Sequence, residues 1–338
     1  MAFPSRTEIV DAMSNPKVCY KANELIGGSI VRKGTRIVQF PGGYATTFPF
    51  INCSGKKVAV RCWALDIGNA KQRSAAISEY LIKEQSPLPY FMNFKYVDNA
   101  ILIKGVLQPV IVMDWVEGKT LKEHINENIE RETFLQLAEK FKLMMGELHG
   151  KNIAHGDLQH GNIMVKDDGS LILVDYDSMY IEQLNGMADI IKGLPGYQHP
   201  MRTRNTKIHS KLDYFSELVI YLSLLIFAEK PQLWQRYYET EDLLFTKEDF
   251  VNIRNSGIHK EFCTSSNTMI SNLMQKMEES LCKTDIQDLL PLEELLVDKW
   301  KKTMDTLFGD GGKVGNQPNP PEKKVYPLPD INSTLSKF

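Results

Sequence analysis

Asp157, Asn162 and Asp175 are the residues whose types and spacing are best suited to chemistry in this sequence. Asn162 follows Asp157 by five positions, and Asp175 follows it by 18. Transfer of a phosphoryl group needs a carboxylate that accepts the proton of the attacking hydroxyl, and oxygen ligands that hold Mg²⁺ against a triphosphate. Asp157 suits the first role, and Asn162 and Asp175 suit the second. The alternative is that Asp157 and Asn162 only cap turns in a polar hairpin.

The context of these residues favours the chemical interpretation. Two short apolar runs, 163–165 and 171–174, are separated by a turn at Gly169 and have the character of paired strands.

The elements that must position these residues are divided along the chain, strands first and helices later. Strand patterns occupy 37–40, 46–51, 58–63, 91–96 and 110–116, and a helical pattern covers 72–84. Long helices are predicted at 132–149 and at the very apolar 214–227, and a short one begins at an N-cap, Ser5, and ends at Met13. The expected fold is α+β and bilobal, with a small antiparallel-sheet lobe that includes one helix and a larger helical lobe.

We expect four segments from this pattern. They are an N-terminal extension (1–36), a sheet lobe (37–113), a helical lobe (114–308) and a flexible tail rich in glycine and proline (309–338). The tail is predicted to be dispensable for folding, because it holds few large apolar residues. Its one apolar cluster, 325–329, could dock in an extended polyproline form, or could simply be solvated.

Composition excludes several classes of protein. The formal net charge is −2 with both signs interspersed, which gives no support to a nucleic-acid or membrane partner. The five cysteines form no C-x-x-C pair, so neither a disulfide framework nor a zinc ribbon is predicted. No secretory leader or long apolar span is apparent. We therefore expect a cytoplasmic protein, whose oligomeric state the sequence leaves open.

The segment His155–Asn162 and the triplet Asp175–Asp177 resemble the catalytic loop, H-R-D-L-x-x-x-N, and the D-F-G motif of the protein-kinase superfamily. The resemblance extends from about Val38 to Leu296. It implies that Asp157 is the catalytic base, that Asn162 and Asp175 bind Mg²⁺, and that ATP phosphorylates a protein Ser/Thr hydroxyl.

Two further motifs agree with this resemblance. Asp213–Ser216 resembles the helix start whose aspartate braces the catalytic-loop backbone, and Tyr197–Pro200 stands in the place of the A-P-E segment.

The same resemblance implies a nucleotide site. Gly42, Gly43, Tyr44 and Ala45 correspond to the glycine-rich loop, and Arg61 with Glu79 corresponds to the phosphate clamp. The residues expected around adenine are Ala59, Met113 and Met164, with hydrogen bonds from the hinge backbone of Asp114 and Val116.

A narrower resemblance is to an uncharacterised bacterial group of Ser/Thr-kinase-like proteins. Its motifs A-V-[KR]-C-F, D-Y-D and Y-Q-H-P are matched by Ala59–Trp63, Asp175–Asp177 and Tyr197–Pro200. Membership of this group implies the fold more than it implies a substrate.

Several positions depart from the kinase pattern. Arg61 replaces the usual lysine, Phe40 and Ala45 replace outer glycines of the loop, Gly156 replaces the arginine before Asp157, and Gln159 replaces a lysine. Because of Gly156, activity is expected not to require phosphorylation of the activation loop.

Three functions stay open: a protein Ser/Thr kinase, a pseudokinase scaffold or nucleotide-binding regulator, and a small-molecule phosphotransferase of the aminoglycoside or choline kinase type.

Overall fold

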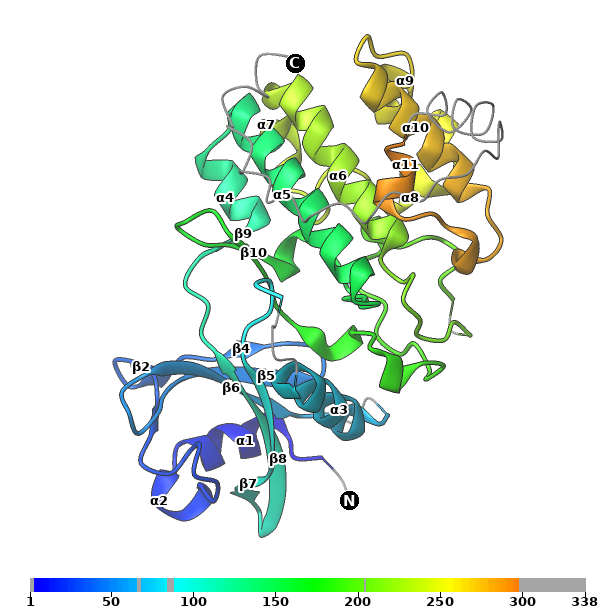
Figure 1. Ribbon diagram of the computed structural model, residues 1–338. Helices are drawn as coiled ribbons and strands as arrows, with labels where there is room; N and C mark the ends of the chain where they lie inside the picture. The colour runs from blue at the N-terminus through cyan, green and yellow to red at the C-terminus, as the bar shows by residue number, and fades with distance from the viewer. Residues whose placement is uncertain (1–2, 66–67, 84–87, 204, 298–338) are drawn as a thin grey trace, which may run out of the picture. The chain divides into compact units, whose positions relative to one another are not determined.

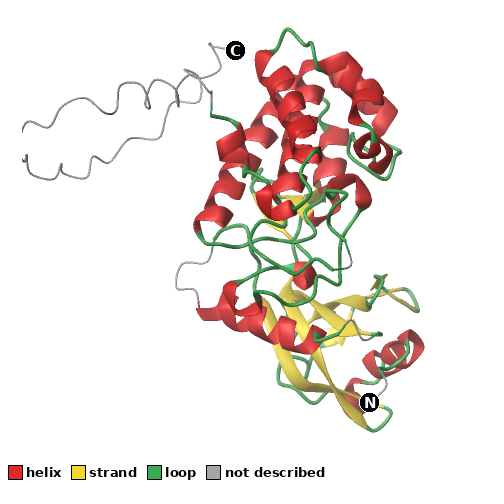
Figure 2. Ribbon diagram, turned by 90° about the vertical axis from the view of Figure 1, so that its right-hand side faces the viewer, coloured by secondary structure: helices red, strands yellow, loops and turns green. Residues whose placement is uncertain are grey.

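The computed structural model describes residues 3–65, 68–83, 88–203 and 205–297. Both lobes belong to one compact unit that covers residues 1–296. Strands gather in the N-lobe and helices in the C-lobe, as Figure 1 and Figure 2 show, so the predicted α+β bilobal fold is confirmed. The tail at 309–338 and its cluster at 325–329 lie outside the described residues. No helix in the described part of the chain combines the length and apolarity needed to cross a membrane.

An antiparallel sheet forms the N-lobe, with the strand order β1-β5-β6-β8-β7 and β4 also paired to β5. Its strands are β1 (Ser29–Ile30), β4 (Phe40–Pro41), β5 (Ala45–Ile51), β6 (Lys57–Trp63), β7 (Phe94–Ile103) and β8 (Val106–Asp114). Helix α3 (Ala70–Lys83) packs against β7.

The alternation of side-chain directions along β6 determines which of its side chains face the C-lobe. Val58, Val60 and Cys62 belong to one apolar cluster, whereas Ala59 and Trp63 belong to the cluster that continues into the C-lobe. Successive side chains of a strand point to opposite faces, so Arg61 shares the second face with Ala59 and Trp63. The strand pattern therefore directs Arg61 towards the C-lobe.

The N-terminal segment contributes to the N-lobe core. Helix α1 (Arg6–Met13) begins with a capping box between Ser5 and Glu8, and its Ile9 and Met13 are fully buried in the cluster that also holds β5 and β6. A second short helix, α2 (Pro16–Cys19), follows. Part of the segment predicted as an extension thus packs on the sheet.

The edge strand beside β5 is divided in two. β1 and β4 both pair with β5, and a small hairpin of β2 (Arg32–Lys33) and β3 (Arg36–Ile37) lies between them in sequence. The single strand predicted at 37–40 is therefore wrong: Ile37 pairs within the hairpin, while Phe40 pairs with Thr47 of β5.

The C-lobe is built around α5 (Arg131–Gly150) and α6 (Tyr214–Glu229), the two long helices that the sequence predicted. Helix α6 is buried on nearly all sides, which explains its continuous apolar run. The other helices are α4 (Leu121–Glu127), α7 (Trp234–Tyr237), α8 (Lys247–Val251), α9 (Gly257–Phe262), α10 (Thr268–Leu281) and α11 (Leu292–Leu295). A small sheet joins β9 (Lys119–Thr120), β10 (Ile163–Val165) and β11 (Leu171–Leu173) in the order β11-β10-β9.

Candidate active site

Asp213, the residue directly before α6, holds the backbone of the catalytic loop, His155–Asn162. The Asp213 carboxylate, 1% exposed, accepts a hydrogen bond from the backbone N–H of Gly156 at 2.9 Å and another from the N–H of His155. The His155 ring is fully buried and places Nε2 2.9 Å from the carbonyl oxygen of Val174. The predicted bracing of the loop by Asp213 is therefore present, and it fixes the backbone of the two residues directly before Asp157.

Hydrogen bonds bring the three predicted chemical residues together. Asn162 Nδ2 donates to the backbone oxygen of Asp157 at 2.8 Å, and the N–H of Val174 donates to the backbone oxygen of Asn162 at 3.0 Å. Val174 directly precedes Asp175, so the metal-ligand candidates Asn162 and Asp175 lie at adjacent ends of the β10–β11 hairpin. Because Nδ2 of Asn162 is committed to the loop, its Oδ1 remains as the acceptor for a cation.

Asp157 has the electrostatics of a proton acceptor. Burial raises the pKa of its carboxyl to about 6, the nearby His155 opposes the rise, and the carboxylate of Asp175 adds to it. A general base works best with a pKa near the operating pH, so this shift suits the predicted role.

Arg61 is bound to the D-Y-D segment. Its NH1 donates to Asp175 Oδ1 at 2.7 Å, and its NH2 contacts Asp177 Oδ2. Burial alone would raise the pKa of Asp175, but the Arg61 guanidinium outweighs it and holds that pKa below its usual value. Asp175 has a φ of +66°. Its side chain keeps 42% of its surface exposed, so the ion pair with Arg61 leaves part of the carboxylate accessible.

The predicted pair between Arg61 and Glu79 is not formed. Glu79 is 64% exposed and pairs with Lys83, one turn further along α3. The buried residues of α3 are Ala70, Arg73, Ser74, Ile77 and Ser78, a stripe that excludes Glu79. The phosphate clamp inferred from the sequence is corrected accordingly: the carboxylates that hold Arg61 come from Asp175 and Asp177.

The glycine-rich loop is a tight turn between β4 and β5. The N–H of Gly42 donates to the backbone oxygen of Ala45 at 2.8 Å, and Tyr44 is 38% exposed. Arg6 of α1 donates to the carbonyl of Gly42 and, at 3.4 Å, to that of Gly43. Sequence reasoning missed Arg6, because a single arginine 36 positions away carries no local signal of this contact.

The predicted adenine residues come from three strands. Ala59 of β6 and Met113 of β8 are register partners and are both buried, and Met164 lies on β10. At the hinge, the N–H of Asp114 donates to the oxygen of Asn93 at 3.2 Å, so this N–H is already used.

Next along the hinge, Val116 is partly buried. Its neighbour Trp115 contacts Phe40 with ring centroids 6.0 Å apart. The start of the glycine-rich loop thus rests on the hinge.

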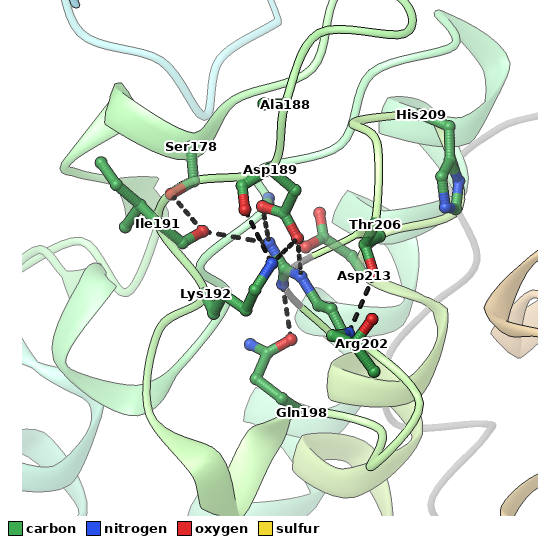
Figure 3. Close-up of polar contacts among 12 residues, drawn as sticks. Ser178, Ala188, Asp189, Ile191, Lys192, Gln198, Arg202, Thr206, His209 and Asp213 are labelled. Carbon is green, nitrogen blue, oxygen red and sulfur yellow. Dashed lines mark hydrogen bonds and ion pairs between the residues drawn. The ribbon is translucent and has the colours of Figure 1, made fainter. Parts of the chain in front are cut away.

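A buried charge cluster orders the segment between the D-Y-D and Y-Q-H-P motifs (Figure 3). Arg202 binds the Asp189 carboxylate through Nε at 2.7 Å and NH2 at 2.9 Å, and both side chains are 1% exposed. Lys192 Nζ lies 2.9 Å from Asp189 Oδ2, and Arg202 NH2 also donates to the carbonyl of Ile191 at 3.2 Å. Sequence reasoning missed this cluster, whose members lie in irregular segments without periodicity.

The Y-Q-H-P motif docks on the C-lobe helices. Ser216 Oγ of α6 donates to the backbone oxygen of Tyr197 at 2.8 Å, and His199 Nε2 lies 3.0 Å from the oxygen of Ser280 of α10. Tyr197 contacts His160 through its hydroxyl, and burial lowers the pKa of His160 to about 4. His160 is therefore a neutral packed residue.

The donor set fits a magnesium ion that is shared with a nucleotide. Among the described residues no group of three or more His, Cys, Asp or Glu side chains could hold a metal. Mg²⁺ in phosphoryl-transfer sites is usually bound by one or two protein oxygens and completes its shell with phosphate and water. Asn162 and Asp175 supply a pair of this kind.

Comparison with known proteins agrees with this geometry. Serine/threonine-protein kinase ppk6 of Schizosaccharomyces pombe is 28% identical over 155 residues, covering 46% of this chain and 18% of that protein. STE20 of Saccharomyces cerevisiae is 26% identical over 194 residues (57% and 20%), and MST20 of Pyricularia oryzae is 25% identical over 182 residues (53% and 19%). Both are also named serine/threonine-protein kinases.

The chain spans a fifth or less of the length of these relatives. All three are fungal, so they do not support the bacterial assignment suggested by the motifs. The family model described as "Protein kinase domain" matches residues 41–301, which is well over half of the chain. Since the two-lobed fold agrees with this match, this chain belongs to the protein kinase domain family.

Proposed function

We propose that this protein transfers the γ-phosphoryl group of Mg-ATP to a Ser or Thr hydroxyl of a protein substrate. The observation that carries the proposal is the convergence of Asp157, Asn162 and Asp175 through the hydrogen bonds of Asn162 and Val174. Phosphoryl transfer depends on positioning and charge stabilisation, and these residues supply a base and two cation ligands on one rigid frame.

Each residue has a definite task in this reaction. Asp157 accepts the proton of the acceptor hydroxyl, and its raised pKa, about 6, suits that transfer near neutral pH. Asn162 and Asp175 would hold Mg²⁺, which neutralises charge on the phosphate oxygens. Arg61 offers a guanidinium beside Asp175 that can also face phosphate.

Phosphate transfer from radiolabelled ATP, with Mg²⁺, to a peptide library containing Ser and Thr tests the proposal. We expect Asp157→Ala to abolish transfer and to leave Mg-ATP binding nearly intact, because the base contacts the acceptor and not the nucleotide. Asp167→Ala is the matched control, since Asp167 is an exposed carboxylate in the β10–β11 turn and should behave as wild type. Equal labelling by wild type and Asp157→Ala would assign the activity to a contaminant and refute the proposal.

Binding is tested separately by a thermal shift. A ligand that binds only the folded state at about 100 times its Kd stabilises it by about 2.7 kcal/mol, so Mg-ATP should raise the melting temperature. Absence of both a shift and a calorimetric signal would refute nucleotide binding itself.

A pseudokinase scaffold is the second candidate, and the Arg61–Asp175 pair favours it. In this arrangement a metal-ligand carboxylate is already neutralised by a cation at 2.7 Å. The scaffold predicts no labelling of any acceptor by wild type.

The third candidate, a small-molecule phosphotransferase, rests on Gly156. Against it stands the docking of Tyr197 and His199 on α6 and α10, which forms an ordered segment suited to receive a peptide. A panel of aminoglycosides and choline in the same assay separates these outcomes.

Our narrower proposal is that the chain belongs to the uncharacterised bacterial group with A-V-[KR]-C-F, D-Y-D and Y-Q-H-P motifs. It rests on Ala59–Trp63, Asp175–Asp177 and Tyr197–Pro200 alone. An alignment of homologues in which the three motifs occur together outside bacteria would refute it.

A further inference from the structure

The glycine-rich loop carries two neighbouring backbone N–H groups that are open to a ligand. They belong to Gly43 and Tyr44, the two residues between the hydrogen-bonded Gly42 and Ala45. Among the described residues, neither N–H group has an acceptor. Both residues are exposed, so the space beside these donors is accessible from solvent.

Arg6 determines the direction in which these N–H groups point. Its NH2 donates to the backbone oxygen of Gly42 and, at 3.4 Å, to that of Gly43. A trans peptide unit is planar and directs its C=O and the following N–H to opposite sides, and the described residues contain no cis peptide. The oxygens of Gly42 and Gly43 share peptide units with the N–H groups of Gly43 and Tyr44. Both N–H groups therefore point away from Arg6.

Helix α1 brings Arg6 to the loop from the face of the sheet that is opposite to Arg61. Ile9 of α1 belongs to the same apolar cluster as Val60. Successive side chains of a strand point to opposite faces, so Arg61 lies on the other face. Ala45, which follows the loop, belongs to the cluster on that face, which continues into the C-lobe. The N–H groups that point away from Arg6 are thus turned towards the face that carries Arg61.

The helix that presents Arg6 is anchored near both of its ends. Glu8 Oε1 lies 2.5 Å from Lys104 Nζ in the turn between β7 and β8. At the other end, Met13 is fully buried, and its backbone oxygen accepts a hydrogen bond from the Tyr20 hydroxyl at 2.7 Å. Arg6 therefore extends from a fixed support.

We propose that Arg6 is a positioning residue, which holds the glycine-rich loop with the N–H groups of Gly43 and Tyr44 directed at the phosphates of ATP. The inference rests on the nucleotide binding of the proposed function and adds a residue to it. Successive backbone N–H groups in a turn form a concave site for anions. Arg6 bonds to the opposite side of the same peptide units, so it orders the loop without contacting phosphate. A loop that is ordered before binding loses less conformational entropy when the ligand arrives.

Calorimetry of the full chain with Mg-ATP and with adenosine tests the proposal. Arg6→Ala removes the guanidinium and keeps a residue that favours the helix. We expect the Kd for Mg-ATP to rise about tenfold, the size expected when the bound loop loses the support of one hydrogen-bonding side chain. The Kd for adenosine should stay within about twofold of wild type, because adenosine has no phosphate for the loop to bind. Arg6→Lys keeps one charged donor, so its Kd for Mg-ATP should lie between those of wild type and Arg6→Ala.

Arg36→Ala is the matched control, because Arg36 is exposed on the β2–β3 hairpin of the same lobe and the change removes the same charge. It should keep the wild-type Kd for both ligands. An equal rise in the Kd for Mg-ATP in Arg6→Ala and Arg36→Ala would mean that Arg6 acts through its charge alone, and would overturn the proposal.

Two other results would also overturn it. One is an unchanged Kd for Mg-ATP in Arg6→Ala. The other is an equal loss of affinity for Mg-ATP and adenosine together with a lower melting temperature, because this result would show a merely structural role in the N-lobe. A wild-type chain that binds no Mg-ATP refutes the proposed nucleotide binding, and the role of Arg6 with it. A wild-type chain that binds Mg-ATP but labels no peptide refutes the kinase function alone, and the binding experiment still decides the role of Arg6.

Discussion

Arg61 of β6 and Asp177 form an ion pair in which the side chains are 11% and 6% exposed. Asp177 is the last residue of D-Y-D, and the carboxylate expected from α3 is absent from this position. Helix α3 instead buries Arg73, which is 3% exposed and donates through NH1 to the carbonyl of Ala188 at 3.2 Å. Burial raises the pKa of Asp177 to about 6, while the cations of Arg61 and Arg73 oppose the rise. The carboxylates that hold Arg61 thus come from the D-Y-D segment and not from α3.

We predict that Asp177→Asn lowers the free energy of unfolding and raises the KM for ATP. Removing one partner of a buried ion pair leaves the other charge uncompensated, at a typical cost of about 3–5 kcal/mol in free energy of unfolding. Arg61 keeps Asp175 as its other partner, so we place the loss at the lower end of this range. Urea unfolding measures the loss, and KM for ATP should rise at the same time.

Glu79→Gln serves as the control for this prediction. Glu79 is exposed and pairs with Lys83. Exposed pairs of this kind contribute little to stability, so stability and KM should stay close to wild type. A larger effect of Glu79→Gln than of Asp177→Asn would contradict our assignment of the Arg61 partner.

Gly156→Ala should be strongly destabilising. Gly156 has a φ of +79°, and a Cβ at this residue would lie 2.1 Å from the backbone oxygen of Ser178. The left-handed backbone alone costs an alanine about 1 kcal/mol, and the clash with a backbone atom forces the loop to move. We expect a total loss of about 2–4 kcal/mol, as for other strained backbone positions, and a large loss of kcat.

The matched change is Gly146→Ala. Gly146 lies exposed within α5, and an added Cβ there meets nothing within 4 Å. Alanine in a helix is favoured over glycine by up to about 1 kcal/mol, so this variant should melt later than wild type. A Gly156→Ala variant with the melting temperature of wild type would contradict this prediction. It would mean that the backbone at Gly156 has room for a side chain, so that lack of space does not explain why the arginine of other kinases is absent here.

A third prediction concerns pH and the ion cluster of α5, α6 and α11. His149 Nε2 lies 3.0 Å from Glu217 Oε2, and its Nδ1 lies 2.9 Å from Glu293 Oε1. Burial alone would lower the pKa of His149, but the two carboxylates raise it to about 9. Burial raises the pKa of Glu217 to about 7, although His149 opposes the rise. Between these values the two side chains form a charged pair.

His149→Ala should therefore destabilise the protein more at pH 5 than at pH 8. A base whose folded pKa is raised contributes stability that is fully present below its unfolded pKa and is lost as the pH rises through the folded pKa. Because the pKa of His149 is raised to about 9, its contribution is complete at pH 5 and has begun to decline at pH 8. We expect a loss of about 3 kcal/mol at pH 5 and a smaller one at pH 8, measured by urea unfolding.

His124→Ala is the control for the pH series. Burial lowers the pKa of His124, the opposite direction from His149. A histidine with a lowered folded pKa costs stability as the pH falls, so its removal should cost no more at pH 5 than at pH 8. A pH-independent loss in His149→Ala would mean that the pair with Glu217 carries no net charge interaction.

The tail remains a prediction from composition. We expect a chain that ends before Gly309 to lose less than about 1 kcal/mol of stability, because glycine- and proline-rich segments bury too little apolar surface to offset their ordering entropy. Melting curves of the full and shortened chains measure the difference. A greater loss would show that the tail packs on the body.

The sequence by itself determined the chemical residues and the order of the lobes. Asp157, Asn162 and Asp175 lie within 19 consecutive residues, so local hydrogen bonds and one hairpin are enough to bring them together. The bracing by Asp213 was predictable through the resemblance to kinases and not from local pattern, because Asp213 and Gly156 are 57 positions apart. Localisation and oligomeric state stay predictions or open questions.

Only the tertiary structure decided which charges pair. Arg61 meets its carboxylates across 114 and 116 positions, and Gly193 reaches Asp157 from another segment. Several acidic residues compete for a buried cation, and the choice depends on which of them the packed helix and loops turn inwards. For α3 that stripe contained Arg73 and excluded Glu79. Pairing of this kind follows from the relative placement of whole elements, which no local pattern encodes.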